Sequence, residues 1–165
     1  MNNMQEFTSL KELVTCSLYI TYATVNEDGS PHNSPMFYIP DSKLDKIYIG
    51  THPDSLHANN LARTGKAFGV LFGKIPAGGR GVYFKIENFY EVTKEELPEA
   101  LKVHNEARAK ISKDAITIDY YQEPNPQRMY GGDIIELSMN DTVRNSQGRL
   151  EKDIRRIVEL DELLS

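Results

Sequence analysis

The segment SLYITYATVNEDGSPHNSPMFYI, residues 17–39, contains two strand-like runs on either side of a tight-turn sequence. In the first run, residue types alternate with the period of two that is typical of a strand, and many side chains are β-branched or aromatic. The sequence NEDG, Asn26–Gly29, is typical of a turn, and the chain returns as a second strand over Ser30–Ile39. Because Pro31 and Pro35 have no backbone N–H, the returning strand is expected at a sheet edge or a bulge. The segment therefore predicts a β-hairpin.

Downstream of this hairpin, further strand-like runs are separated by turns and by short helical patterns. Alternation is clearest over Val82–Val92, where the charged side chains fall on one face. So many hairpins argue against a parallel α/β sheet and for a mainly β fold, an antiparallel closed or split β-barrel of about six strands with appended helices. The other strand-like runs are Lys46–Gly50, Ala67–Phe72, Ala115–Tyr121 and Met129–Met139.

Three segments have helical patterns in addition to the one that follows residue 51. Apolar residues at helical spacing predict an N-terminal helix over about residues 5–15. A second helix is expected after Thr93–Glu96, which reads as a capping box ahead of an apolar stripe. The ending RLEKDIRRIVELDELL predicts an amphipathic C-terminal helix over about residues 150–164. Since the chain has no repeat and no linker rich in glycine, serine or proline, we predict a single domain over residues 1–165.

Composition excludes several classes of protein. The chain has 165 residues, 39% of them hydrophobic, with 19 basic against 24 acidic side chains and a net charge of −5. Without a basic cluster, nucleic acid is not an expected partner. The longest weakly polar stretch, Leu13–Val25, falls well short of the roughly 20 residues that a membrane-spanning helix needs. The start MNNMQEF does not resemble a signal peptide and Cys16 is the only cysteine, so a cytoplasmic location is expected.

The stretch THPDSLHANNLAR, residues 51–63, follows a predicted strand and has the residues of a helix start. The start can be placed in two ways. Thr51 is the N-cap with Asp54 closing a capping box, or Asp54 caps a helix that begins at Ser55. Gly65 suits the end of the helix in both cases.

The same stretch could hold a metal ion, could bind an anion, or could only cap its own helix. His52 and His57 are five residues apart, whereas two ligands on one helical face need a spacing of three or four, so no metal site is predicted. A helix N-terminus with the hydroxyls of Thr51 and Ser55 and the ring of His57 offers the donors that a phosphate monoester needs. Self-capping remains the commoner role of such a pattern.

The order of these motifs resembles a known family. The hairpin YATVNEDGSPHNSPMFYI, the strand KIYIGT, the stretch SLHANNLARTGKAFGVLFG and the strand GVYFKIENFYEV followed by a helix are similar to the pyridoxamine 5'-phosphate oxidase-like, FMN-binding split-barrel family. The likeness runs from about Ser17 to Ile111 and continues more weakly through Arg128–Leu137. It implies a homodimer of six-stranded split barrels that binds FMN at the dimer interface.

The resemblance also assigns roles to residues. Asn33, Ser34, Pro35 and Met36 would line the flavin ring, and Ile49, Gly50 and Thr51 would reach the ribityl chain and the phosphate, with Ser55, His57 and Asn60 completing the phosphate site. His57 stands where the family usually has lysine or arginine. The strand that often carries an arginine reads HNSPMF. Arg63, Arg80 or a residue of the partner chain could supply the positive charge instead.

The implied function is that of an FMN-dependent oxidoreductase, a flavin reductase or an oxidase acting on a small molecule. The substrate residues of the true oxidase are not recognisable here, so its substrate is not assigned. Two alternatives stay open, a non-catalytic flavin-binding or sensing module and a haem-binding split barrel. The cofactor alternatives to FMN are accordingly FAD, haem or none, and catalytic residues are not assigned.

Overall fold

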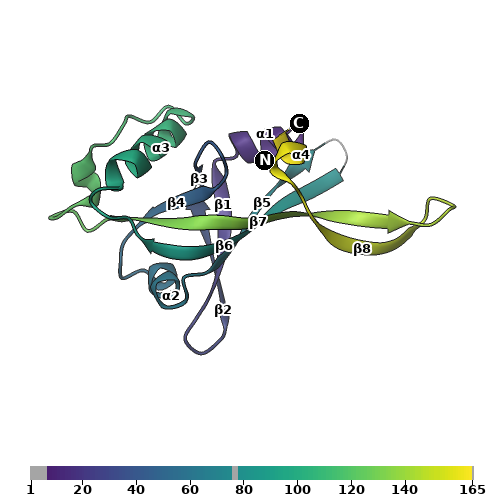
Figure 1. Cartoon of the computed structure of the whole chain (residues 1–165), viewed down its shortest axis with the longest axis horizontal. Helices are drawn as coiled ribbons and strands as arrows, with labels where there is room; N and C mark the ends of the chain where they lie inside the picture. The colour runs from purple at the N-terminus through teal and green to yellow at the C-terminus, as the bar shows by residue number, and fades with distance from the viewer. Residues whose placement is uncertain (1–6, 76–77, 165) are drawn as a thin grey trace, which may run out of the picture.

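A computed structural model describes residues 7–75 and 78–164, without the side chains of residues 74–80. The described residues form one curled antiparallel sheet with helices on its faces and ends (Figure 1). Its strands are β1 (Tyr19–Val25), β2 (Pro31–Phe37), β3 (Ile39–Pro40), β4 (Lys46–Thr51), β5 (Ala67–Ile75), β6 (Gly78–Glu91), β7 (Arg128–Arg144) and β8 (Leu150–Ile157). The helices are α1 (Leu10–Cys16), α2 (Leu56–Thr64), α3 (Leu97–Ala109), the 3-10 helix η1 (Ile118–Tyr121) and α4 (Leu160–Leu164).

The sheet curls into a split barrel because its first and last strands belong to one segment of chain. The strand order is β2-β1-β5-β6-β7-β4-β3, with β8 paired to β7. Only Tyr38 separates β2 from β3. The predicted mainly β split barrel is confirmed. The described residues contain eight strands and not six, because the returning strand of the first hairpin is broken in two and the C-terminal segment adds β8.

The first hairpin forms as predicted. Strands β1 and β2 pair in register from Tyr19 opposite Phe37 to Val25 opposite Pro31. The turn closes with the amide of Asn26 donating to the carbonyl of Ser30 at 2.9 Å. As its prolines require, β2 lies at an end of the strand order, so one of its edges has no strand partner among the described residues.

Apolar side chains fill both sides of the β4–β7 region. The barrel interior is packed with large buried residues such as Ile20, Ile49 and Phe84. A second cluster lies between the sheet and α3, and it includes Tyr48, Met129 and Tyr121. β4 is therefore held on two faces, and its end is a rigid place from which to present a side chain.

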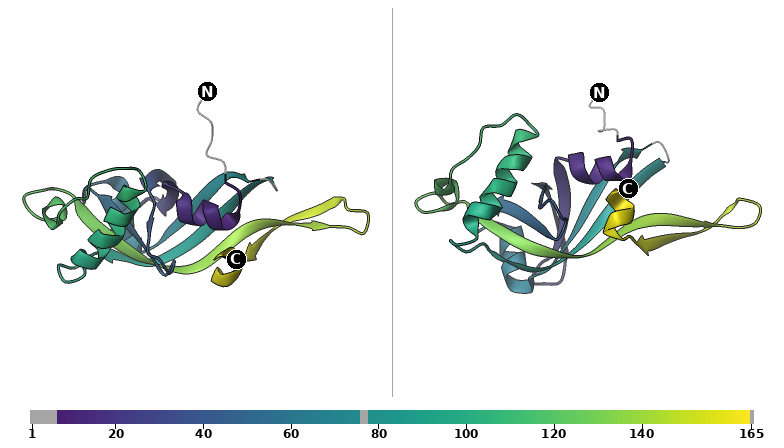
Figure 2. Two further views of the ribbon diagram at one scale, coloured as in Figure 1. Left: turned by 90° about the horizontal axis from the view of Figure 1, so that it is seen from above. Right: turned by 45° about the horizontal axis from the view of Figure 1, so that its top comes forward.

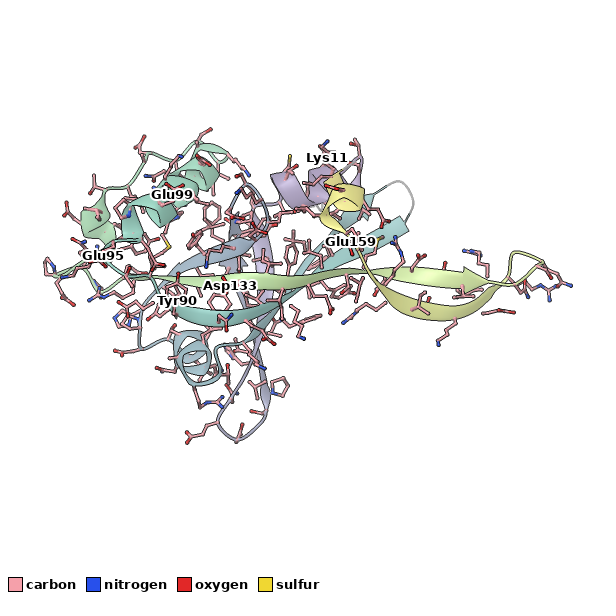
Figure 3. All side chains as sticks on the ribbon, viewed as in Figure 1. Lys11, Tyr90, Glu95, Glu99, Asp133 and Glu159 are labelled. Carbon is pink, nitrogen blue, oxygen red and sulfur yellow. The ribbon has the colours of Figure 1, made fainter. Side chains whose placement is uncertain are left out.

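The second predicted helix begins with the expected capping box. The amide of Glu96 donates to the Thr93 hydroxyl at 3.3 Å, and the amide of Thr93 donates to the Glu96 carboxylate at 3.1 Å. The Tyr90 hydroxyl on β6 also donates to Glu96 at 2.8 Å. Tyr90 pairs with Gly131 on the neighbouring strand β7, and Figure 3 shows Tyr90 and Asp133 on these two adjacent strands. These bonds tie the start of α3 to the sheet.

The predicted C-terminal helix over residues 150–164 is wrong for most of its length. Residues Leu150–Ile157 form β8, and only Leu160–Leu164 is helical. The reason is the turn Asn145–Gly148, which sends the chain back along β7, with the amide of Asn145 donating to the Arg149 carbonyl at 3.0 Å. The β7–β8 hairpin projects from the body (Figures 1 and 2). At the other end of the chain, α1 is helical over Leu10–Cys16, so it overlaps the predicted range of about 5–15 and ends one residue beyond it; residues 5 and 6 lie outside the described part of the chain.

The predicted strand Ala115–Tyr121 is also wrong. It is an extended loop that ends in η1. The side chain of Asn105 on α3 forms hydrogen bonds with both backbone groups of Ile116. It accepts from the amide at 2.9 Å and donates to the carbonyl at 3.0 Å. A side chain thus replaces the strand partner that this segment would need.

Two tyrosine hydroxyls in the barrel interior give a stability prediction. Tyr22 and Tyr38 are buried, and within the described residues neither hydroxyl has a hydrogen-bond partner. An unpaired buried polar group costs about 1–3 kcal/mol. We expect Tyr38→Phe to leave the free energy of unfolding unchanged or to raise it by about 1 kcal/mol in urea denaturation. The matched change Tyr121→Phe, which removes a hydroxyl bonded to His104 at 2.8 Å, should lower it. A clear loss of stability in Tyr38→Phe would contradict the prediction.

Candidate functional site

Polar side chains from β2, β4 and α2 meet at one end of the barrel. The Thr51 hydroxyl lies 2.7 Å from Nε2 of His57 and 3.2 Å from the Ser55 hydroxyl, which is itself 3.1 Å from the same nitrogen. On the other side of the ring, Nδ1 of His57 lies 3.5 Å from the Ser34 hydroxyl. That hydroxyl is 2.9 Å from Nε2 of His32. We call these five residues the hydroxyl–imidazole cluster.

The cluster forms because β4 ends at Thr51 and α2 begins five residues later, at Leu56. Ser55 is the N-cap of α2, and its hydroxyl accepts from the Ala58 amide at 3.3 Å. Both predicted cap positions are therefore wrong, because Thr51 is still part of the strand and the helix begins at Leu56. Gly65 ends the helix with φ 64°, as predicted. The amides of Leu56 and His57, in the first turn, have no carbonyl within the helix to bond.

Burial keeps the His57 ring mostly uncharged. Desolvation lowers the pKa of His57 below its ordinary value, and the charge of nearby His32 lowers it further. The His57 ring therefore carries little charge near neutral pH, although the cluster holds three hydroxyls, two imidazoles and the positive end of a helix dipole. An anion placed there would favour the protonated ring.

The structure brings four of the ten predicted site residues into the cluster, namely Ser34, Thr51, Ser55 and His57. Ser34, which is predicted to line a flavin ring, has its side chain facing His57. Its neighbours Asn33 and Pro35 are exposed on the opposite face of β2, and Met36 is half-buried.

The other three predicted residues have different surroundings. Ile49 is fully buried in the barrel core, and Gly50 is covered by Tyr121. The Asn60 amide nitrogen donates to the Thr24 hydroxyl at 3.1 Å and to the Asn26 side chain at 2.8 Å. Asn60 thus fastens α2 to the first hairpin.

Basic residues near the cluster are engaged elsewhere. Arg63 donates to the carbonyl of Val25 at the hairpin. The side chain of Arg80 lies outside the described residues. Arg128 pairs in register with Thr51, which sequence reasoning missed because only strand pairing reveals it. Its guanidinium is held by Glu123 and by the loop carbonyls of Asn125 and Gln127.

A partly exposed, mostly apolar face lies on the outside of the sheet next to β2, and Arg155 of β8 lies over two of its rings, those of Phe68 and Tyr83. Cross-strand partners share a face of a sheet, and Thr21, Val70 and Tyr83 are such partners on β1, β5 and β6. On this face Tyr19 is 62% exposed and Phe72 is 63% exposed. The outer apolar face, as we call it, consists of Tyr19, Thr21, Ala23, Pro35, Phe68, Val70, Phe72 and Tyr83.

No helix in the part of the chain that the structure describes is both long enough and apolar enough to span a membrane.

The fold and the cluster define a split-barrel protein with a candidate anion site at the junction of β4 and α2. The sequence matches the family described as pyridoxamine 5'-phosphate oxidase over residues 8–157. The chain belongs to this family. No curated protein matches the chain at the sequence level.

Solved structures with the same fold include proteins of different kinds. Rv2991 from Mycobacterium tuberculosis is 26% identical, with a TM-score of 0.57 over 76% of this chain and 77% of that one. A pyridoxamine 5'-phosphate oxidase-related, FMN-binding protein from Nostoc punctiforme is 12% identical, with a TM-score of 0.52 over 86% and 87%. HutZ, the haem storage protein from Vibrio cholerae, is 15% identical, with a TM-score of 0.59 over 76% and 87%.

Proposed function

We propose that this protein binds FMN, with the phosphate at the hydroxyl–imidazole cluster, and acts as an oxidoreductase on a small molecule. The observation that carries the proposal is the convergence of Thr51, Ser55 and His57 on the first turn of α2, where two amides have no intrahelical partner. Hydroxyl, imidazole and amide donors at a helix N-terminus suit a phosphate monoester. The residues present therefore fit the phosphate end of FMN.

The flavin ring would lie along β2. Asn33 and Pro35 are exposed on the outer side of this strand, and one edge of β2 has no strand partner among the described residues. When bound, the flavin supplies electron transfer, which no side chain provides. The protein holds the phosphate, presents polar backbone groups to the ring and, in a dimer, excludes water from it.

The outer apolar face supports a homodimer. β5 carries apolar side chains on both faces, with Leu71 in the core and Phe68, Val70 and Phe72 outside. A strand that is apolar on both faces is typical of one that is covered on both sides. A second copy packed on this face would place its surface next to Asn33 and Pro35, where the flavin ring is proposed.

An absorbance spectrum of the purified protein tests the proposal. We expect flavin bands, or their appearance after FMN is added, and oxidation of NADH or NADPH by the flavin-loaded protein. A protein that binds FMN without turnover would be a flavin-carrying or sensing module.

The haem-binding alternative has support in the likeness of the fold to that of HutZ. A Soret band on haem titration, together with no binding of FMN, would favour it. The cytoplasmic location stays a prediction.

The affinity for FMN should depend on pH through His57. Without an anion the pKa of His57 lies below its ordinary value, owing to burial and to His32. A phosphate dianion beside the ring raises that pKa, so binding takes up a proton, and the affinity rises as pH falls through the pKa of the bound state. We expect a gain of about three- to tenfold between pH 8.5 and 6.5, before the phosphate itself, with a pKa near 6, gains a proton.

Fluorescence titrations of FMN over this pH range measure the effect. In His57→Lys the side chain is charged throughout, so the affinity should be higher at pH 8.5 and nearly flat with pH. Riboflavin, which has no phosphate, is the ligand control. A wild-type profile as flat as that of the lysine variant would exclude His57 as the titrating group.

A further inference from the structure

Tyr121 lies against the backbone of β4 directly behind the hydroxyl–imidazole cluster. A Cβ atom at Gly50 would overlap the Tyr121 hydroxyl and lie 2.9 Å from Cε1 and Cζ of its ring. A phenol ring thus fills the place where any other residue at position 50 would put its side chain. The next residue, Thr51, makes the shortest contact in the cluster, at 2.7 Å from His57. The strand end that presents Thr51 therefore rests on Tyr121.

His104 on α3 holds Tyr121 in this place. The Tyr121 hydroxyl lies 2.8 Å from Nδ1 of His104, and both side chains are buried. Burial lowers the pKa of His104 to about 4, with a smaller effect from the charge of Arg108, and burial also raises the pKa of Tyr121. Both groups are neutral at ordinary pH, and the hydroxyl and the ring nitrogen share one hydrogen bond. The pair is a fixed contact between α3 and η1.

The same pair also reaches β2. The ring of His104 packs on the ring of Phe37 with centroids 5.8 Å apart, and Phe37 ends the strand that carries Ser34. Thr51 and Ser34 stand on opposite sides of His57. Ser34 comes from β2, the first strand in the order, and Thr51 comes from β4, the last but one. Contact with both strands lets one buried pair fix their spacing around His57.

We propose that Tyr121, held by His104, is a positioning residue for the candidate phosphate site, because it sets the end of β4 and with it the Thr51–His57 contact. The proposal rests on the proposed function for its ligand, since it predicts an effect on the phosphate of FMN. Its geometric part concerns the protein without flavin. Neither residue contacts the cluster directly, so a loss of FMN affinity in these variants would be transmitted through β4.

Two measurements on the full chain test this role. The first is the pair of dissociation constants for FMN and riboflavin, from flavin fluorescence. The second is the titration of the His57 ring by NMR in the flavin-free protein. Tyr121→Phe removes the bond to His104, and Gly50→Ala forces the ring away from the strand. Tyr120→Phe is the matched control, because Tyr120 is the neighbouring residue and is exposed.

We expect Tyr121→Phe to weaken the binding of FMN about threefold to tenfold and the binding of riboflavin less than twofold. A loss of this size corresponds to roughly one hydrogen bond. Gly50→Ala should weaken FMN more and move the His57 midpoint by about half a pH unit or more. Adding Tyr121→Ala to Gly50→Ala removes the overlap but also the ring on which β4 rests, so it should not recover FMN affinity. Tyr120→Phe should match the wild type in all readouts.

The proposal is overturned if Tyr121→Phe and Gly50→Ala lower thermal stability but leave both flavin affinities and the His57 titration unchanged, since Tyr121 would then be only a core residue. If the wild type does not bind FMN, the proposed function fails while the His57 titration still tests the geometric part. An unchanged His57 midpoint in Gly50→Ala would then reject positioning independently.

Discussion

Replacing Thr51 and His57 together, as Thr51→Val/His57→Ala, is expected to weaken FMN binding about a hundredfold while changing riboflavin binding less than threefold. Hydrogen bonds to a charged group contribute about 1.5–3 kcal/mol each, and 1.4 kcal/mol is a factor of ten in affinity. Thr51 and His57 lie 2.7 Å apart, so a phosphate within reach of one is within reach of the other. Riboflavin has no phosphate, so its affinity should be nearly unchanged.

A matched double variant separates this effect from damage to the helix. Thr64→Val/His52→Ala also removes one threonine hydroxyl and one imidazole around α2. Thr64 is at the far end of the helix and bonds the Asn60 carbonyl, and the His52 ring pairs with Asp54, so neither touches the cluster. Isothermal titration with both flavins is the measurement. Equal losses for FMN and riboflavin in the first variant would place the phosphate elsewhere.

Local signals predicted the elements whose structure is decided locally. The turn at Asn26–Gly29, the capping box at Thr93 and the glycine that ends α2 all form as expected, because each depends on residues within a few positions. β8 was missed because Leu150 and Ile154 are spaced as on a helix. Its strand conformation comes from pairing with β7, which the sequence of the segment alone does not determine.

The candidate site divides in the same way. Thr51, Ser55 and His57 could be predicted together because they are close in sequence. The end of a strand followed at once by the start of a helix places such residues close together in space. Ser34 and His32 join them only through the curl of the sheet, and Arg128 comes beside Thr51 only through strand register. Tyr121 fell in a segment predicted to be a strand, so its contact with Gly50 had no signal in the sequence.

The second large effect is expected at the outer apolar face, where Phe72→Asp should convert a dimer into a monomer. Phe72 is 63% exposed, so aspartate there leaves the barrel core of one chain intact. In a dimer packed on this face the carboxylate would be buried without a partner, which costs several kcal/mol. A weakening of self-association by about a hundredfold or more follows, measured by light scattering after size exclusion across a dilution series.

Val143→Asp is the control, because Val143 is also an exposed apolar residue, at 40%. It lies on the opposite face of the sheet from Tyr83, since Tyr83 pairs with Ser138 and Ser138 pairs with Ile157, whereas Val143 points to the other side of β7. If FMN lies between the two chains, Phe72→Asp should lose FMN and riboflavin affinity together, since both share the ring that the partner covers. This pattern differs from that of Thr51→Val/His57→Ala, which spares riboflavin. A Phe72→Asp variant that stays dimeric would move the dimer contact to another surface, and a monomer with full flavin affinity would place the cofactor within a single chain.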